Sequence, residues 1–308
     1  MVQNIIIVAE QVAVLFILIA VGFGSGKAGL INEKGAKNLT DIVLYLATPC
    51  IMVQSFQNVR YDPALATNLG VAALCAVLIQ VASIFVARAV FRNKNIVRRK
   101  VLQFGTIFSN CGFMSLPLQQ AVIGTHGVFY GAAFVAVFNI LVWSYGLVDM
   151  SGDKKNFTLK KILLNPGILG AAAATTLFLL RIELPTIALS PISFIAALNT
   201  PVPMLVIGYH LSQANLLKAF SDKGVYAVTA MRLVAVPCAA LLIMKLCGVS
   251  GEILTSCTIA SSAPVAATTT MFATKFDKDV ELSVGLVSVT TIISIVTMPI
   301  IIAAAQSI

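Results

Sequence analysis

The stretch VLQFGTIFSNCGFMSLPLQQAVIG, residues 101–124, is long and apolar enough to cross a lipid bilayer, which takes about 20 residues. Its middle nevertheless carries Asn110, Gly112 and Pro117. Proline removes a backbone donor and clashes with the carbonyl four residues earlier, so the helix is predicted to be kinked or broken near residues 111–117. Unpaired backbone groups at membrane depth must be buried in protein or face a water-filled cavity. We therefore expect a broken helix that lines a binding site.

The composition is that of an integral membrane protein. Hydrophobic residues make up 58% of the 308 residues, charged residues make up 11%, and the mean hydropathy is +0.95. Soluble domains are about 45–50% apolar and about 25% charged. The first apolar run lacks a basic leader and a cleavage site, so we expect a retained span and not a signal peptide. The net charge of +9 is explained by the positions of the charges between spans, so no nucleic-acid partner is expected.

Apolar runs separated by charge, glycine or proline predict an all-α polytopic protein with ten membrane spans. The spans cover about residues 4–24, 38–56, 65–91, 101–123, 127–149, 162–181, 187–211, 224–247, 251–274 and 281–305.

The basic residues divide unequally between the two sides of the membrane if the loops alternate. The richer side receives Lys27, Lys34, Lys37, Arg88, Arg92, Lys94, Arg98, Arg99, Lys100, Lys154, Lys155, Lys160, Lys161, Lys218, Lys223, Lys275 and Lys278. The poorer side receives only Arg60, Arg181 and Lys245. The positive-inside rule places the richer side in the cytoplasm. Both termini are then predicted on the non-cytoplasmic side of the cell (inner) membrane.

Two sequence patterns occur twice at nearly the same offset. Residues 46–52 and 198–204 both read Leu-x-Thr-Pro-x-x-Met. The serine, asparagine and proline of residues 109–117 are matched by Ser-Ser-x-Pro at residues 261–264. One five-helix unit is therefore predicted to occur twice, and because five is odd, the second copy must be inverted in the membrane. The two halves are residues 1–150 and 151–308.

Inverted repeats with an interrupted helix at matching positions are typical of secondary transporters, whose substrate site lies near the bilayer midplane. Where spans four and nine cross, their half-helix N-termini would present free N–H groups and about half a positive charge each. This favours an anionic substrate such as a carboxylate. The alternative is that the small polar residues there only let helices pack closely. The candidate substrate-binding residues are Ser109, Asn110, Gly112, Asn199, Ser261 and Ser262, with Thr268, Thr269 and Thr270 as further donors.

Five prolines mark predicted crossover or hinge points. Pro117 and Pro264 would interrupt the two crossing spans. Pro49 and Pro201 each follow a threonine, whose hydroxyl can satisfy a freed carbonyl, so they are either simple kinks or parts of the site wall. Pro203 adds a second break to the seventh span.

Ionisable residues inside spans are functional candidates because burying them is expensive. The guanidinium of Arg232, about eight residues into span eight, either pairs bidentately with a substrate carboxylate or extends to the cytoplasmic surface. Glu10, Asp41 and His210 lie nearer the span ends, where they are either interfacial or proton-coupling groups. Histidine is the side chain that titrates near neutral pH unperturbed.

Enzymatic signatures are missing from the sequence. It contains no HExxH, GxSxG or GxxxxGK[ST] pattern, which argues against an enzyme and against primary active transport. The six cysteines have no CxxC spacing, so small buried thiols are favoured over disulfides or metal ligands. No metal and no cofactor are expected.

The chain resembles the auxin efflux carrier family, the bacterial PIN-like transporters of the bile/arsenite/riboflavin transporter superfamily. The resemblance covers essentially the whole length. Its strongest parts are residues 21–50, FSNCGFMSLPL (108–118), NPGILG (165–170), NTPVPMLVIGYHL (199–211), RLVAVP (232–237) and residues 261–299.

The resemblance implies a ten-helix, five-plus-five inverted fold shared with sodium/bile acid symporters. Helices one, two, six and seven would form a scaffold that often dimerises, and helices three to five with eight to ten a moving transport domain of the elevator type. Pro117 and Pro264 would be the crossing prolines, with Asn110 near the substrate. Family substrates are auxin and small carboxylates such as malate or malonate. The plant members' long central cytoplasmic loop has no counterpart in this sequence.

We therefore expect a secondary carrier of a small organic anion. An anion leaving a negative interior gains about 2.3 kcal/mol per charge per 100 mV, so export needs no coupled ion on energetic grounds, whereas uptake would need one. Two alternatives remain open. One is a sodium-coupled organic anion symporter, and the other is a membrane sensor that keeps a transporter fold without moving a substrate.

Overall fold

The computed structural model describes residues 2–92, 94–153, 159–214 and 216–307. These residues fold into helices, and the described part of the chain contains no β-strand beyond one isolated bridge. Lys154 and Lys155, two of the basic loop residues, lie outside the described residues.

The helices follow one another along the chain with short connections, and η marks a π-helical turn. The first half contains α1 (Val2–Lys27), α2 (Glu33–Ile42), η1 (Val43–Ala47), α3 (Thr48–Gln57), α4 (Pro63–Val90), α5 (Ile96–Ile107), η2 (Cys111–Ser115), α6 (Leu116–Val122), α7 (Thr125–Leu141), η3 (Val142–Gly146) and α8 (Leu147–Ser151). The second half contains α9 (Leu159–Leu163), α10 (Pro166–Leu179), α11 (Thr186–Ala197), α12 (Pro201–Gln213), α13 (Leu216–Phe220), α14 (Lys223–Ala230), η5 (Met231–Ala235), α15 (Val236–Leu246), α16 (Gly251–Ser262), α17 (Thr268–Lys275) and α18 (Val280–Gln306).

Seven helical segments among the described residues are long and apolar enough to cross a membrane, as expected of a polytopic membrane protein. A shorter apolar helix is α10. The segments that contain residues 101–124 and 251–274 do not meet the length criterion, because each is interrupted and its halves are short. The total of ten spans and the inverted repeat remain predictions. The seven segments are Ala9–Lys27, Glu33–Gln57, Pro63–Val90, Thr125–Ser151, Thr186–Gln213, Lys223–Leu246 and Val280–Gln306.

Most π-helical turns of the described chain are followed by a proline. The turns η1, η2 and η5 end two residues before Pro49, Pro117 and Pro237, respectively. A proline ring clashes with the carbonyl four residues earlier, and in these three places that carbonyl belongs to the π-helical turn. The wider turn lets the helix continue past the proline, at the cost of a local bulge of the kind often found at functional sites.

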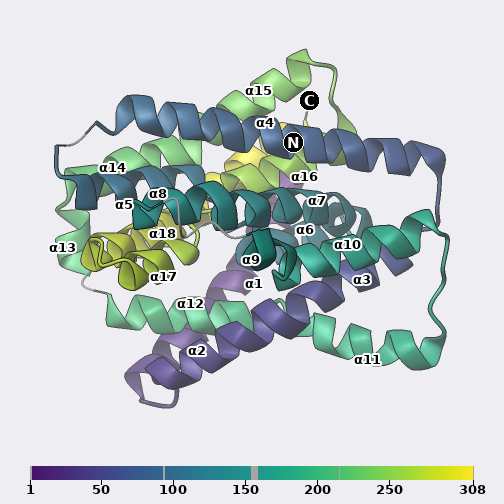
Figure 1. Ribbon diagram of the computed structural model, residues 1–308, viewed down its shortest axis with the longest axis horizontal. Coiled ribbons are helices and arrows are strands. Elements are labelled where there is room, and N and C mark those ends of the chain that lie inside the picture. Colours follow the sequence, from purple (N-terminus) through teal and green to yellow (C-terminus); the bar gives the residue numbers. More distant parts are fainter. Residues whose placement is uncertain (1, 93, 154–158, 215, 308) are drawn as a thin grey trace.

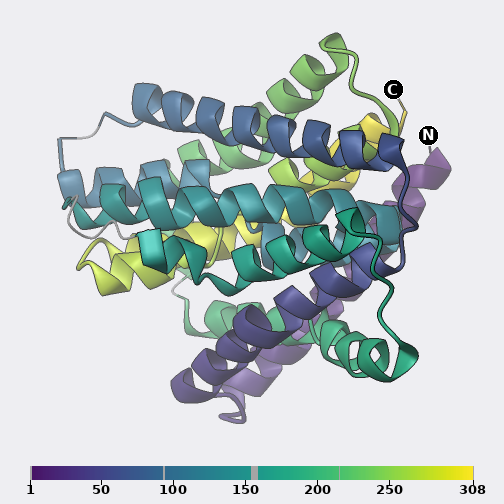
Figure 2. The same cartoon turned by 45° about the vertical axis from the view of Figure 1, so that its right-hand side comes forward.

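The helices form two packed groups (Figures 1 and 2). Helices α2, α3, α11 and α12 lie below the group that contains α4, α5, α7 and α14–α18, and α1 runs from the upper right of Figure 2 down among them. In the lower group, α1 and α12 approach closely at Gly22 and Gly208. A Cβ built on Gly22 would lie 2.7 Å from the Cα of Leu205, and one built on Gly208 would lie 2.6 Å from the backbone nitrogen of Phe23. Small residues at such contacts bring two backbones together, which is how membrane helices pack.

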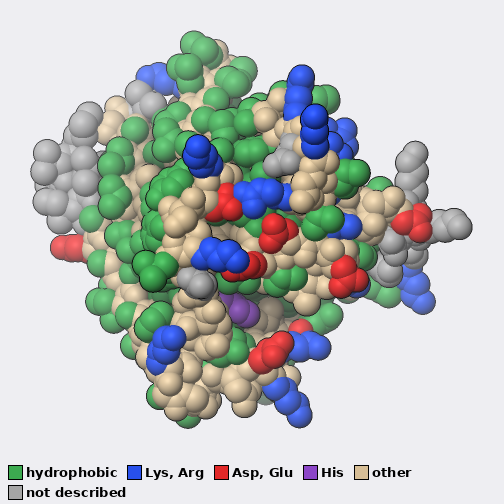
Figure 3. Space-filling view, turned by 90° about the vertical axis from the view of Figure 1, so that its left-hand side faces the viewer, with side chains coloured by type: hydrophobic (Ala, Val, Ile, Leu, Met, Phe, Trp, Pro, Cys, Tyr) green, Lys and Arg blue, Asp and Glu red, His purple; other side chains and the backbone are tan. Residues whose placement is uncertain are grey.

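The charged turns gather at one end of the molecule. The α4–α5 and α17–α18 turns lie at the left-hand end in both ribbon views, the α1–α2 turn lies at the lower left in Figure 1, and both termini lie toward the right-hand end in Figure 2. The face at that left-hand end carries many Lys and Arg side chains with Asp and Glu between them (Figure 3). Lys100 contacts Asp149 there at 2.5 Å, and Lys218 contacts Glu281 at 2.6 Å. The basic loops and the termini thus lie at different ends of the helices.

Candidate functional site

The two interrupted helices meet at their breaks. Helix α5 ends at Ile107 and α16 ends at Ser262, and between these ends and the next helical turns Ser109 and Val265 form an antiparallel bridge. The backbone N–H of Asn110 donates to the carbonyl of Pro264 at 2.7 Å, and that of Ala266 donates to the carbonyl of Phe108 at 3.0 Å. The two breaks therefore satisfy part of each other's backbone, as membrane depth requires.

The first break lies earlier than the position of Pro117 suggests. The backbone leaves the helix at residues 108–110, and residues 111–117, where a kink or break was expected, are helical because η2 accommodates the proline. The amides of Asn110 and Ala266 also face the opposite break and not a solute. The N–H groups left for a ligand are those of the first helical residues after each break, which have no intrahelical acceptor.

Arg232 holds the ends of both interrupted helices. Its side chain is 2% exposed, and Nη1 donates to the carbonyls of Thr106 at 3.1 Å and Ile107 at 3.2 Å, in the last turn of α5. Its Nη2 donates to the carbonyl of Ser261, in the last turn of α16. The guanidinium thus does not extend to the surface in this structure, and its bonds are to backbone oxygens at the C-terminal ends of α5 and α16, just before the two breaks.

A cavity of about 90 Å³ lies where the helical segments that follow the two breaks begin. It is bounded by the starts of three helical segments, η2–α6, α17 and α10, together with η1 and the α7–η3 helix. No residue that lines it is an Asp, Glu, Lys or Arg. The lining residues are Leu44, Tyr45, Thr48, Asn110, Gly112, Phe113, Val135, Phe138, Asn139, Trp143, Asn165, Pro166, Gly167, Ala266, Ala267, Thr268 and Met271.

Two buried polar atoms at this cavity lack a protein partner. They are Nδ2 of Asn110, whose side chain is 4% exposed, and Oγ1 of Thr268. Three helix starts at one cavity add about half a positive charge each. An uncharged cavity with positive helix ends and unpaired donors has the chemistry to hold a small anion.

The other predicted substrate-binding side chains are placed differently. Ser109, Ser261, Ser262 and Asn199 are buried but do not line this cavity. The hydroxyls of Ser261 and Ser262 donate back to carbonyls of their own helix, each at 3.1 Å. Asn199 accepts a hydrogen bond from Thr48 at 3.1 Å, so the two Thr-Pro motifs of the chain lie in contact. Of the residues named from the sequence, the cavity brings together Asn110, Gly112 and Thr268, and it does not include Thr269 or Thr270.

The remaining ionisable candidates lie away from the crossing. Glu10 and Asp41 are exposed on α1 and α2, and His210 is exposed near the end of α12, where its ring lies 5.3 Å from the ring of Tyr209. None of the three lines the cavity. Within the described residues, no group of three or more His, Cys, Asp or Glu side chains is arranged to hold a metal ion.

Several cavity residues were not singled out from the sequence as site residues. Asn139 interrupts an apolar run on α7, and its Nδ2 donates to the carbonyl of Val135 at 3.0 Å. Asn165 caps α10 by accepting from the N–H of Ile168 at 3.2 Å. A polar amide inside an apolar run and an Asn-Pro-Gly helix start were the available signals. Trp143 carried no such signal, because an aromatic residue in an apolar helix is ordinary.

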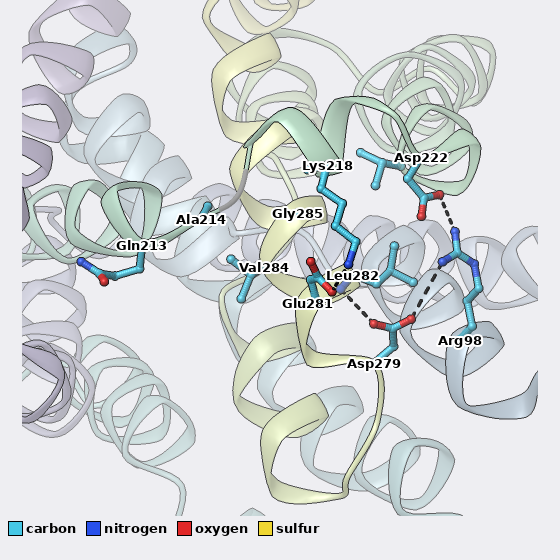
Figure 4. Close-up of a pocket in the computed structure, with 12 residues that line it drawn as sticks. Arg98, Gln213, Ala214, Lys218, Asp222, Asp279, Glu281, Leu282, Val284 and Gly285 are labelled. Carbon is cyan, nitrogen blue, oxygen red and sulfur yellow. Dashed lines mark hydrogen bonds and ion pairs between the residues drawn. The ribbon is translucent and has the colours of Figure 1, made fainter.

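A larger cavity, of about 450 Å³, lies at the charged end (Figure 4). Arg98 contacts Asp222 and lies 3.9 Å from Asp279, and the Lys218–Glu281 pair forms another wall. The Arg98 guanidinium holds the pKa of Asp222 below its usual value. Because these charges are paired with one another across α5, α13, α14 and α18, we interpret this cavity as the joint between loops and not as the substrate site.

Comparisons with known proteins match this chain over nearly its whole length. A family model described as a membrane transport protein matches residues 7–302. An uncharacterized transporter of Methanocaldococcus jannaschii is 23% identical over 301 residues, covering 94% of this chain and 96% of the relative. An uncharacterized transporter of Methanothermobacter thermautotrophicus is 23% identical over 295 residues, with the same coverage. The resemblance noted from the sequence is thereby confirmed, and the chain belongs to this membrane transport protein family, the auxin efflux carrier family.

Proposed function

We propose that this membrane transporter is a secondary carrier of a small organic anion, with a carboxylate as the bound group and the cavity beside the crossed breaks as its site. The observation that carries the proposal is Asn110. Its Nδ2 is a buried donor without a protein partner, next to two helix starts that also present donors. Leaving a buried donor unpaired costs about 1–3 kcal/mol, so a ligand that supplies the acceptor recovers this energy.

The size of the cavity favours a small substrate. Pockets for drug-sized ligands measure about 300–1,000 Å³, whereas this one measures about 90 Å³. A short dicarboxylate such as malonate or malate is a closer match than an indole acid or a bile salt. The aromatic wall formed by Tyr45, Phe113, Phe138 and Trp143 would exclude water from the bound anion.

The proposal includes the architecture that the sequence predicts. Ten spans would form two inverted five-helix units in the cell membrane, with both termini on the non-cytoplasmic side. The antiparallel pairing of the two breaks and the contact between Thr48 and Asn199 support this symmetry. Helices α1–α3 and α9–α12 would form the scaffold, and the remaining spans would move past it as an elevator. The exposed apolar side chains of Ile187 and Phe194 on α11 fit a scaffold that forms a homodimer.

The test is a thermal-shift screen of purified protein with malonate, malate, indole-acetate and taurocholate. A ligand that binds the native state raises the melting temperature by mass action. We expect malonate or malate to raise it, and the matched neutral diamide malonamide to have no effect. Equal shifts from the acid and the diamide would contradict the anion assignment.

A matched pair of variants locates the site. Asn110→Ala removes the unpaired donor and should abolish the malonate shift. Asn32→Ala, which removes an exposed N-cap of α2 far from the cavity, should lower stability but leave the malonate shift intact. A malonate shift that survives in Asn110→Ala would place the site elsewhere.

Flux measurements separate the two alternative functions. Malonate uptake into proteoliposomes that required a sodium gradient would favour a sodium-coupled symporter. A protein that bound malonate without any flux, under a membrane potential of either sign, would favour a sensor.

A further inference from the structure

Arg232 is a buried cation whose partners are backbone oxygens of two different helices. In the described part of the chain, no ion pair includes Arg232. Its three acceptors are the carbonyls of Thr106, Ile107 and Ser261. Each belongs to the last turn of α5 or α16, where carbonyls have no intrahelical donor. The guanidinium therefore supplies donors to three of the carbonyls that lose their intrahelical donor where the two helices are interrupted.

The charges at this point balance. A helix C-terminus carries about −0.5 of an elementary charge, so the ends of α5 and α16 together present about −1. The guanidinium supplies +1 and is held by three hydrogen bonds from its Nη atoms. Removing it would leave three buried carbonyl oxygens at two negative helix ends without their donor. Carbonyl oxygens at negative helix ends attract a cation.

Carriers with interrupted helices commonly bind their coupling cation in this kind of place, on unwound backbone carbonyls and the C-terminal ends of half-helices. We propose that Arg232 is a built-in cation that takes the place of a coupling ion, so that the crossing keeps its geometry and binds its substrate anion without sodium. The substrate part of this statement rests on the proposed function. The cation part rests only on Arg232 and the three carbonyls.

The guanidinium does not contact the proposed substrate cavity. Arg232 is absent from the residues that line the cavity, which lies at the starts of the helical segments after the breaks. Its Nε is buried without a protein partner, and its Nη atoms are engaged by the carbonyls. Arg232 is therefore a positioning residue. It fixes the C-terminal ends of the broken helices and leaves the positive helix starts free for the anion.

The test is chemical rescue of Arg232→Ala, measured as melting temperature in detergent. Millimolar guanidinium chloride, well below denaturing concentrations, is compared with tetramethylammonium chloride at equal ionic strength. Tetramethylammonium has the same charge but no N–H donor. We expect the variant to melt several degrees below wild type, and its melting temperature to rise with the logarithm of guanidinium concentration as a bound ligand requires.

Two controls define the background. Wild type has its own guanidinium in place, and Arg88→Ala removes a more exposed arginine that lies over the ring of Tyr145. The melting temperatures of wild type and of Arg88→Ala should respond equally to guanidinium and to tetramethylammonium. If Arg232→Ala responds to the two cations as the controls do, the built-in cation is refuted.

A wild-type measurement keeps the inference testable even if Arg232→Ala cannot be purified. Wild type is titrated with sodium chloride against choline chloride, with and without malonate. We expect no sodium-specific rise in melting temperature and equal malonate shifts in both salts. A saturable sodium effect would overturn the inference. An absence of any malonate shift would count against the proposed function alone, because rescue by guanidinium does not depend on a substrate.

Discussion

Two glycines in one helix turn give a sharp test of the close packing between α1 and α12. Gly22 faces α12, and a Cβ built on it would lie 2.7 Å from the Cα of Leu205. Gly24, two residues later in the same helix, has no atom within 4 Å of the equivalent Cβ. We predict that Gly22→Ala destabilises the protein, whereas Gly24→Ala does not.

The expected size follows from these distances. Carbon atoms in contact lie about 3.5–4.0 Å apart, so the new methyl group of Gly22→Ala would push α1 and α12 apart by roughly 1 Å. The obstructing atoms are backbone and cannot move to another rotamer, so we assign the usual overpacking cost of about 1–3 kcal/mol. Gly24→Ala should instead gain about 0.5–1 kcal/mol from the lower conformational freedom of alanine. The two variants should differ by about 1.5–4 kcal/mol.

The assay is the melting temperature of each variant in the same detergent and lipid. At about 2–4 °C per kcal/mol for a large domain, the two variants should differ by at least about 3 °C, with Gly22→Ala the less stable. Malonate should still produce a thermal shift in both variants, because neither glycine lines the cavity. A Gly22→Ala variant as stable as Gly24→Ala would refute the close approach of the two helices.

Three further predictions concern the site and the charged end. Asn110→Asp should abolish the thermal shift produced by malonate, because a carboxylate in the cavity repels an anion. Asn110→Ser should retain part of that shift, and equal malonate shifts in the two variants would contradict the prediction. Thr48→Val should lower the free energy of unfolding by about 1–3 kcal/mol, because it leaves the buried Oδ1 of Asn199 without the hydroxyl that donates to it. Thr48→Ser keeps a hydroxyl and should not lower it. Denaturation in detergent measures the stability of both variants. Arg98 lowers the folded-state pKa of Asp222, so this carboxylate stabilises the protein above its ordinary pKa of 3.8 and stops doing so as the pH falls through the folded value. The melting temperatures of wild type and Asp222→Asn should therefore converge below about pH 4, and a gap that is constant with pH would refute this.

The sequence alone was sufficient for the class of protein. Composition and the length of the apolar runs require a membrane environment, because so little of the chain is charged. Residues 101–124 and 251–274 could each be recognised as unsuited to a continuous helix, since proline and small polar residues are local signals that act on the backbone nearby. The motifs that carry the family resemblance, between residues 21 and 299, all lie within residues 7–302 that the family model matches.

Only the tertiary structure decided which polar groups are available to a ligand. The hydroxyls of Ser261 and Ser262 are taken by their own helix, while Nδ2 of Asn110 remains unpaired. No local pattern distinguishes these outcomes, because each depends on the neighbours that the fold supplies. The same holds for Arg232, whose carbonyl partners Thr106 and Ser261 lie 126 and 29 residues away in the chain. Whether a buried polar group has a hydrogen-bond partner depends on the packed interior. The sequence therefore shows which polar residues are candidates, and only the tertiary structure shows which of them remain unpaired.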